Sequence, residues 1–160
     1  MSIKFTITSK TAAKAEGTLT WTEKSLTANA VSGPFGNGFI ESGLYHAKRN
    51  VLLDKPGEAP YCDKSNPSNC WFQLLTPQFT TTRTEIGIHP DGNTPGTAGC
   101  IGITIPNTKL WYDALKSVAA GQYTVVEVID TTISVKMLKV KIYKIISPKS
   151  RLRRKKFRKK

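Results

Sequence analysis

Histidine and cysteine are scarce in this chain, and acidic residues are few. Its 160 residues include two histidines and three cysteines, and 11 acidic side chains against 24 lysines and arginines give a formal net charge of +13 at pH 7. No Cys-x-x-Cys or His-x-x-x-His spacing occurs, so we expect neither a metal site nor a cofactor. No run of eighteen apolar residues occurs either, which argues against a membrane-spanning helix.

The basic residues gather at the C-terminal end. The last ten residues, RLRRKKFRKK, contain eight basic side chains and no acid, and removing them lowers the formal charge from +13 to +5. Like charges at this density repel one another, so we expect the end of the chain to be disordered. The length and composition of the remainder suit one globular unit with a buried core. We therefore expect a single domain over residues 1–147 and a basic tail over residues 148–160.

Strand-like alternation of apolar and polar residues dominates the chain. Ile3, Phe5 and Ile7 alternate with polar side chains, which predicts a first strand. Three polar residues separate two of the later runs, which is the length of a hairpin loop. The further runs that we expect to be strands or a β-prone edge are residues 17–22, 26–31, 71–75, 79–82, 123–129 and 133–146.

One segment has helical spacing instead. Pro106 and Asn107 give a start signal, and Gly121 gives a stop signal. Between them, apolar residues recur on one helical face at Leu110, Ala114, Leu115 and Val118. The sequence therefore predicts a mostly β fold with one main α-helix, whose apolar face packs on the sheet.

The stretch with the most chemistry is residues 85–103, EIGIHPDGNTPGTAGCIGI. Two isoleucines alternate with His89, so we expect His89 at a strand end with its side chain opposite the isoleucine face. Residues 90–99 are rich in proline and glycine, which predicts a loop. Strand alternation resumes at Cys100. A loop between two strands can bring the thiol and the imidazole together, although they are eleven positions apart.

A cysteine beside a histidine can perform nucleophilic catalysis. A free thiol has a pKa of about 8.5, and a neighbouring imidazole can take its proton and leave a nucleophilic thiolate. The chemistry would be acyl transfer through a thioester on Cys100, with His89 as the base. Backbone N–H groups near Gly99 and Cys100 are candidates for stabilising the oxyanion. The plainer interpretation stays open at this point: a buried cysteine and a surface or capping histidine without a catalytic role.

Cys62 and Cys70 enclose a polar loop, DKSNPSN. Their spacing allows a disulfide, which would persist only in an oxidising compartment. This pairing would leave Cys100 as the one free thiol. We therefore predict one titratable thiol in the oxidised protein.

The segment TPGTAGCIGI resembles the signature of the L,D-transpeptidase (YkuD-type) family, in which a histidine precedes a Ser/Thr-x-Gly-Cys motif. Thr97, Gly99 and Cys100 match that motif, and His89 is the upstream histidine. The chain is most similar to the shortened L,D-transpeptidase-like effectors of type VI secretion, where an aspartate follows the histidine, as Asp91 does here. The resemblance implies a β-sandwich-like catalytic fold.

The resemblance extends over residues 32–111 and suggests further site residues. The segment ESGLY resembles a Pro-x-Gly-x-Tyr segment of that subfamily through Tyr45. The glycine-rich loop that contains Gly36 is expected to line the cleft. The larger family usually has Cys-x-Arg, where this chain has Gly102. We therefore expect the substrate carboxylate to be bound by another residue, and Arg83 is the candidate.

The function that the resemblance implies is modification of peptidoglycan stem peptides. Cys100 would attack the carbonyl that precedes a terminal D-amino acid, and His89 would act as base and then as acid. Release of the acyl group to water gives L,D-carboxypeptidase activity. Release to a D-amino acid or another amine gives exchange or transpeptidation. The sequence alone does not choose between these outcomes.

Residues 1–17 lack the apolar core of a secretory signal, so we expect synthesis in the cytoplasm and action in the periplasm after delivery by another route. One such setting is an antibacterial toxin, which implies a cognate immunity protein. The other is a phage-type lysis enzyme. In both, residues 151–160 would bind an anionic envelope surface. From another class comes a non-catalytic β-domain with a nucleic-acid-binding tail, which we consider less favoured.

Overall fold

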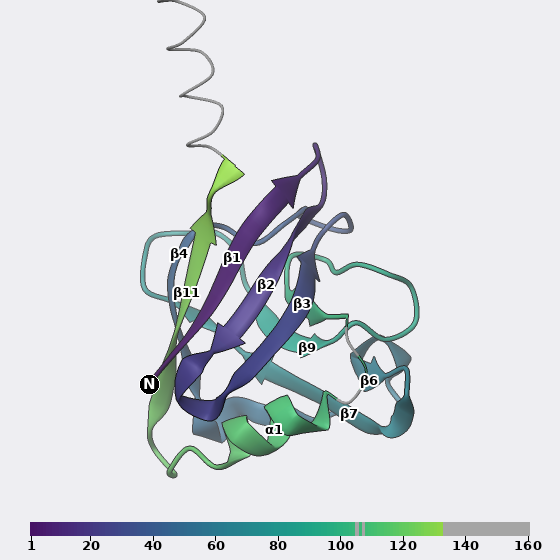
Figure 1. Cartoon of the computed structure of the whole chain (residues 1–160), viewed down its shortest axis with the longest axis vertical. Helices are drawn as coiled ribbons and strands as arrows, with labels where there is room; N and C mark the ends of the chain where they lie inside the picture. Colours follow the sequence, from purple (N-terminus) through teal and green to yellow (C-terminus); the bar gives the residue numbers. More distant parts are fainter. Residues whose placement is uncertain (105, 107, 133–160) are drawn as a thin grey trace, which may run out of the picture.

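A computed structural model describes residues 1–104, 106 and 108–132 (Figure 1). Within this part of the chain, eleven strands form one curled sheet with a single α-helix beside it. The prediction of a mostly β fold with one main helix is confirmed. The strand expected at 133–146 and the basic tail at 148–160 lie outside the described residues. No helix of the described part is long and apolar enough to span a membrane.

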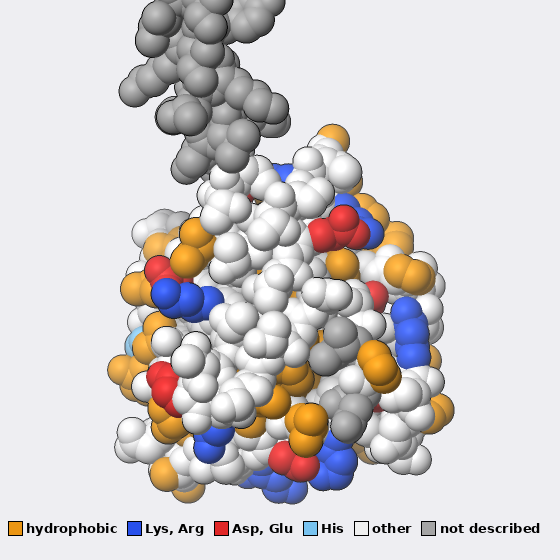
Figure 2. Space-filling view, viewed as in Figure 1, with side chains coloured by type: hydrophobic (Ala, Val, Ile, Leu, Met, Phe, Trp, Pro, Cys, Tyr) orange, Lys and Arg blue, Asp and Glu red, His pale blue; other side chains and the backbone are white. Residues whose placement is uncertain are grey.

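The N-terminal strands form the half of the sheet that faces the viewer in Figure 1. Three strands run antiparallel in sequence, namely β1 (Ser2–Lys10), β2 (Ala15–Trp21) and β3 (Leu26–Ser32). Ile3, Phe5 and Ile7 are buried in the core, as their alternation predicts. The opposite face of these strands is largely polar and uncharged, as the central white area of Figure 2 shows.

The first strand continues the sheet through a parallel neighbour. β11 (Tyr123–Asp130) pairs with β1, and β4 (Gly43–Lys48) pairs antiparallel with β11. The short strand β8 (Thr76–Pro77) ends the sheet beside β4. These pairings place the predicted strand at 123–129 inside the sheet, between β1 and β4.

The other half of the sheet carries the segment of interest. Beyond β3 the order is β10 (Ile101–Ile103), β9 (Gly87–Pro90), β7 (Asn66–Leu74) and β5 (Leu52–Asp54), and β6 (Cys62–Asp63) pairs with β7. The sheet curls so far that Nε2 of Gln73 in β7 donates to the carbonyl of Lys48 at the end of β4 (3.1 Å). Three 3-10 turns complete the described elements: Thr22–Lys24, Arg49–Val51 and Ala59–Tyr61.

The helix α1 spans Lys109–Lys116 and packs against the core through Trp111 and Leu115. Its predicted apolar face is partly wrong, because Leu110 is 55% exposed. The bulkier Trp111 takes the inward position, and its neighbour in sequence is then rotated by about 100° toward solvent.

Three further predictions of local structure need correction. Residues 79–82 do not form a strand. Thr81 uses its hydroxyl in a turn instead: Oγ1 accepts from the N–H of Arg83 (3.1 Å) and donates to Glu41 Oε2 (2.6 Å). The histidine strand begins only at Gly87, because Glu85 adopts a left-handed φ of 55°. The loop predicted between Cys62 and Cys70 is shorter than expected, since β7 already begins at Asn66.

Candidate active site

The two faces of the β9–β10 strand pair have different chemistry. The strands run parallel, with Ile88 opposite Ile101 and His89 opposite Gly102. Since successive residues of a strand point to opposite faces, the isoleucines face the core and His89 faces away from it. Cys100 directly precedes β10, and the thiol and the imidazole border one cavity of about 260 Å³.

His89 is held by backbone atoms and aromatic rings. Its side chain is 5% exposed, and Nδ1 lies 2.7 Å from the carbonyl oxygen of Pro90. The ring stacks on Phe72 with centroids 5.9 Å apart and meets the edge of Tyr61 at 5.1 Å. Burial lowers the pKa of His89 to about 4, against the opposite effect of hydrogen bonds to the Pro90 and Pro60 carbonyls. The imidazole is therefore neutral at pH 7.

Cys100 is also buried and uncharged. It is 9% exposed, and its Sγ donates to the carbonyl of Glu85 at 3.6 Å. Burial raises the pKa of the Cys100 thiol to about 11; a hydrogen bond from the Gly87 backbone lowers it and the charge of Glu85 raises it. The resting pair is thus a neutral thiol beside a neutral imidazole, and the thiol proton points to a carbonyl rather than to the base.

Thr97 organises the turn that presents the cysteine. Its hydroxyl accepts from the N–H of Gly33 (3.1 Å) and of Gly99 (3.3 Å), and it donates to the carbonyl of Cys100 (2.7 Å). Gly99 itself has a φ of 114°, a region that favours glycine. These contacts correct the oxyanion prediction, because the Gly99 N–H already points to Thr97. The backbone N–H of Cys100 is the better candidate.

Asp91 does not contact the imidazole. Its Oδ1 accepts from the N–H of Gly96 (2.9 Å), which closes the loop after His89 on itself. Burial raises the pKa of this carboxyl, against the opposite effect of the Gly96 hydrogen bond and of nearby lysines. Of the two roles open to Asp91, orienting His89 or shaping the turn, the structure therefore shows the second, and the Pro90 carbonyl holds the ring.

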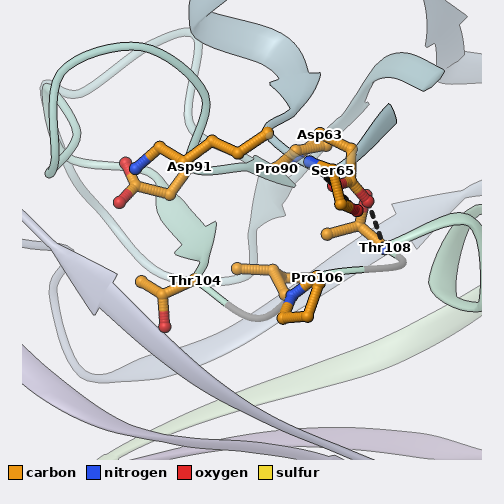
Figure 3. Close-up of a pocket in the computed structure, with 9 residues that line it drawn as sticks. Asp63, Ser65, Pro90, Asp91, Thr104, Pro106 and Thr108 are labelled. Atoms are coloured by element: carbon orange, nitrogen blue, oxygen red, sulfur yellow. Dashed lines mark hydrogen bonds between the residues drawn. The ribbon is translucent and has the colours of Figure 1, made fainter. Parts of the chain in front are cut away.

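Asp91 faces a second cavity, of about 300 Å³, on the other side of its loop (Figure 3). Across this cavity lies Asp63, whose carboxylate the sequence reasoning missed. It accepts from the backbone and hydroxyl of both Ser65 and Thr108, and these bonds lower its pKa despite burial. All four bonds are local or lead to the start of α1, so Asp63 links the β6–β7 hairpin to the helix.

Position 102 has no room for a side chain. A Cβ at Gly102 would lie 2.7 Å from Cγ2 of Thr97 and 3.2 Å from Cβ of Asp91. The space that the arginine would occupy is therefore filled by two residues that hold the loop. Thr97 cannot move aside cheaply, because its hydroxyl has three backbone partners.

Arg83 has a structural position beside the cysteine turn. Its guanidinium donates to the carbonyls of Phe39 (2.5 Å) and Asn37 (2.6 Å), and Nη1 lies 3.4 Å from where a Cβ of Gly99 would be. The expected contact to a substrate carboxylate is not supported, because both terminal nitrogens already bind the 37–39 loop. Arg83 instead ties this loop to the turn that carries Cys100.

Tyr45 is not a cleft residue, and that prediction is wrong. Its side chain is fully buried, its hydroxyl donates to the Glu41 carbonyl (2.7 Å), and its ring meets the edge of Phe79. Gly36, by contrast, lies beside the site: a Cβ there would be 3.0 Å from Cβ of Ala98.

Phe35, Pro60 and Tyr61 line the cavity beside Cys100. Phe35 belongs to the glycine-rich loop that the sequence analysis expected at the cleft, whereas Pro60 and Tyr61 were not predicted. Nothing in the sequence connected Pro60 and Tyr61 to the histidine, because this contact depends on how the β6–β7 hairpin folds back.

The cysteines are arranged as the sequence predicts. Cys62 and Cys70 are joined by a disulfide, and Cys100 is the free cysteine. No group of three or more potential metal ligands occurs among the described residues.

Comparisons of this chain with protein-family models, with curated proteins and with solved structures gave no match. Any function must therefore be inferred from the residues and geometry of the site itself.

Proposed function

We propose that this protein is a cysteine-dependent enzyme that modifies peptidoglycan stem peptides. The observation that carries the proposal is that Cys100, just before β10, and His89, in the neighbouring strand β9, border one cavity. The sequence motif around Cys100, which resembles that of the L,D-transpeptidases, supports the choice of substrate. A hydrogen bond from Nδ1–H to the Pro90 carbonyl would leave Nε2 of His89 unprotonated and available as a base.

The reaction would begin with proton transfer coupled to attack. As the substrate enters, the thiol turns from the Glu85 carbonyl toward His89, and Sγ attacks the carbonyl carbon while the imidazole takes the proton. The N–H of Cys100 donates to the oxyanion. The imidazolium then protonates the leaving amine of the terminal D-amino acid, and a thioester remains on Cys100.

The second half of the reaction releases the acyl group. His89 takes a proton from water or from an acceptor amine, which attacks the thioester, and the proton returns to Sγ as the thiolate leaves. The glycine-rich cavity and the absence of an arginine at position 102 favour trimming or D-amino-acid exchange over cross-linking. The apolar surfaces of Phe35 and Tyr61 favour a small uncharged side chain next to the reacting carbonyl.

The setting that we propose is a delivered antibacterial toxin with a cognate immunity protein. A phage-type lysis enzyme is the alternative. In either case the protein would act in the periplasm, and the basic residues 151–160 would bind the anionic envelope. The same chemistry serves both settings.

The test is mass spectrometry of tetrapeptide and pentapeptide muropeptides incubated with the wild-type protein, with and without a D-amino acid. We expect loss or replacement of the terminal D-alanine. Cys100→Ala and His89→Gln should each abolish the change, whereas Thr27→Ala, at an exposed position of β3, should leave it intact. Unchanged muropeptides with folded wild-type protein would refute the proposal.

One observation favours a second candidate, a non-catalytic β-domain. A buried thiol with a raised pKa is also what an inert structural cysteine shows. This candidate predicts that Cys100→Ala leaves every function intact and that any nucleic-acid binding depends on residues 151–160 alone. A filter-binding assay with the full chain and with Cys100→Ala would support it if both bind equally and neither alters muropeptides.

A further inference from the structure

The segment that leads into the Cys62–Cys70 disulfide also forms part of the active site. The 3-10 turn Ala59–Tyr61 directly precedes Cys62, and the N–H of Tyr61 donates to the carbonyl of Glu58 (2.8 Å). From this turn, the Tyr61 ring meets the edge of His89 at 5.1 Å, and the Pro60 carbonyl favours the protonated imidazole and so raises the pKa of His89. Pro60 and Tyr61 also line the cavity.

Few noncovalent contacts hold this turn in place. None of its residues is buried, and the strand β6 that follows has only two residues. The Tyr61 ring rests on Phe72 at 5.4 Å, and the N–H of Gly92 donates to the Pro60 carbonyl at a long 3.3 Å. A segment with so little buried apolar surface has low local stability.

The disulfide supplies the missing constraint. Cys62 and Cys70 lie opposite each other in the β6–β7 pair, and the covalent bond joins the end of the turn to the long strand β7. The carbonyl of Cys70 also accepts from the N–H of Lys55 (2.9 Å), which fixes the start of the same loop. Both ends of the 55–62 loop are thereby anchored at one residue of β7.

The turn also has to fit closely against the loop after His89. A Cβ at Gly92 would lie 2.0 Å from the carbonyl oxygen of Ala59 and 2.9 Å from that of Cys62. The two backbones are therefore in direct contact, and a small displacement of the turn would move both the Pro60 carbonyl and the wall of the cavity.

We propose that the Cys62–Cys70 disulfide positions His89 through Pro60 and Tyr61, so that the active site is complete only in the oxidised protein. This inference rests on the proposed function for its catalytic consequence, although the positioning itself does not. A thiol reductant donates two electrons and two protons to the bond, yields two cysteine thiols and itself becomes a disulfide. The 59–62 turn then loses its anchor, and His89 loses the contacts that this turn provides.

The biological consequence is a difference between compartments. In a reducing cytoplasm the disulfide does not persist, and the enzyme would be made with an incomplete site. In an oxidising periplasm the bond forms and the site is completed where the substrate is. The protein would then be active only after it has left the cell that made it.

The experiment compares the full-length oxidised protein, the same protein reduced with dithiothreitol, and the double variant Cys62→Ser/Cys70→Ser. Two properties are measured: the ring nitrogen NMR signals of His89, titrated with pH, and the kcat and KM for muropeptide trimming. We expect reduction to move the His89 signals and to lower kcat at least tenfold with a smaller change in KM. Reoxidation should restore both properties in the wild type and neither in the double variant.

A single variant separates positioning from a general loss of structure. Tyr61→Ala retains the disulfide, so it should shift the His89 titration and lower kcat without reductant, whereas Tyr61→Phe, which keeps the ring, should restore both. Far-ultraviolet circular dichroism checks that each variant is folded. If the double variant Cys62→Ser/Cys70→Ser does not fold, the wild-type protein reduced at neutral pH takes its place in the comparison.

The outcomes are distinguishable from those of the proposed function. If the His89 signals and kcat are the same in oxidised and reduced protein, the disulfide does not position the histidine, and the inference is overturned. If reduction shifts the His89 signals while no form of the protein alters muropeptides, the positioning holds and the proposed function fails.

Discussion

The two faces of the β9–β10 strand pair are both buried but are built differently. On the core face, Ile88 and Ile101 pack among other apolar side chains. On the opposite face, His89, Asp91 and Cys100 are almost as buried, yet each is paired with backbone N–H or carbonyl groups. Burial alone therefore does not separate a core from a site. The distinguishing property is that every buried polar group on one face has a fixed backbone partner.

The difference has an energetic side. An apolar face is stabilised by the area of contact between its side chains, and it loses stability when a substitution removes buried side-chain volume. A polar face of this kind is stabilised by a few directional bonds and fails when one partner is left unpaired. Substitutions on the two faces of the same strands should therefore differ in both size and kind of effect.

The largest effect is expected on the core face. Ile101→Ala removes a fully buried side chain and leaves a cavity, so it should lower the free energy of unfolding by about 2–5 kcal/mol. Urea unfolding monitored by tryptophan fluorescence measures this change. Cys100→Ala, one residue earlier on the site face, should cost less than half as much while abolishing turnover. Equal losses of stability would show that the two faces do not differ as described.

A somewhat smaller effect is expected for the hydroxyl that holds the cysteine turn. Thr97→Val keeps the shape but leaves the N–H groups of Gly33 and Gly99 and the carbonyl of Cys100 without this partner. We expect a loss of about 2–3 kcal/mol in unfolding free energy, together with a fall in kcat. Thr97→Ser retains the hydroxyl and should keep most of both. If Thr97→Val changes neither the free energy of unfolding nor kcat, the turn does not depend on the Thr97 hydroxyl.

The tight contact at Gly102 provides a sharper test. Gly102→Ala should destabilise the protein by about 1–3 kcal/mol, because its new methyl group meets Cγ2 of Thr97. Adding Thr97→Ser removes that methyl contact and retains the hydroxyl, so the double variant should recover part of the loss. A double-mutant cycle of unfolding free energies measures the coupling. Additive losses would place the steric conflict elsewhere, with Asp91 as the next candidate.

A further effect, spread over several pH units, is a dependence of stability on pH. The pKa of His89 is lowered by burial to about 4, below its ordinary value, so the unfolded chain binds the proton first as the pH falls. The stability contributed by neutral His89 is complete above about pH 6.5 and declines toward pH 4, by at most about 1.4 kcal/mol per pH unit. The difference between wild type and His89→Gln in urea unfolding isolates this contribution. A difference that does not vary with pH would contradict the environment of the ring.

The protonation of His89 should also determine the pH at which activity falls on the acid side of the pH–rate profile. Turnover needs a neutral imidazole as base, so kcat/KM should fall only as the pH approaches the pKa of about 4 and not near 6.5. The thiol, with its pKa raised to about 11, should stay protonated across the neutral range. An activity profile with an acid limb near pH 6.5 would mean that substrate or solvent enters the site and relieves the burial of His89.

Much of the fold could be predicted from alternation alone. The alternation of Ile3, Phe5 and Ile7 predicted β1 correctly, and the strand predicted at 123–129 matches β11 closely. The failures have a physical cause: β-branched threonines at 80–82 favour strands by propensity, but the Thr81 hydroxyl bonds to nearby groups and stabilises a turn. Local propensity cannot reveal such a competitor.

The candidate site was only half visible in the sequence. The position of Cys100 and His89 at one cavity followed from motif and alternation, and the pairing of the other two cysteines followed from their spacing. The partners of His89 were invisible, because they are carbonyl groups, and every residue has one. The predicted substrate-binding roles of Tyr45 and Arg83 were wrong for the opposite reason. Both are residue types that are common in binding sites, but here both make hydrogen bonds that stabilise the fold.

The loop after His89 is held by hydrogen bonds near its two ends, and its middle residues take no part in them. The Asp91 carboxylate binds Gly96, and Thr97 binds Gly33 through backbone and hydroxyl. Residues 93–95 between these anchors are exposed. Substitutions at these three positions should therefore change which ligands enter the cavity without shifting the side chains of Cys100 and His89.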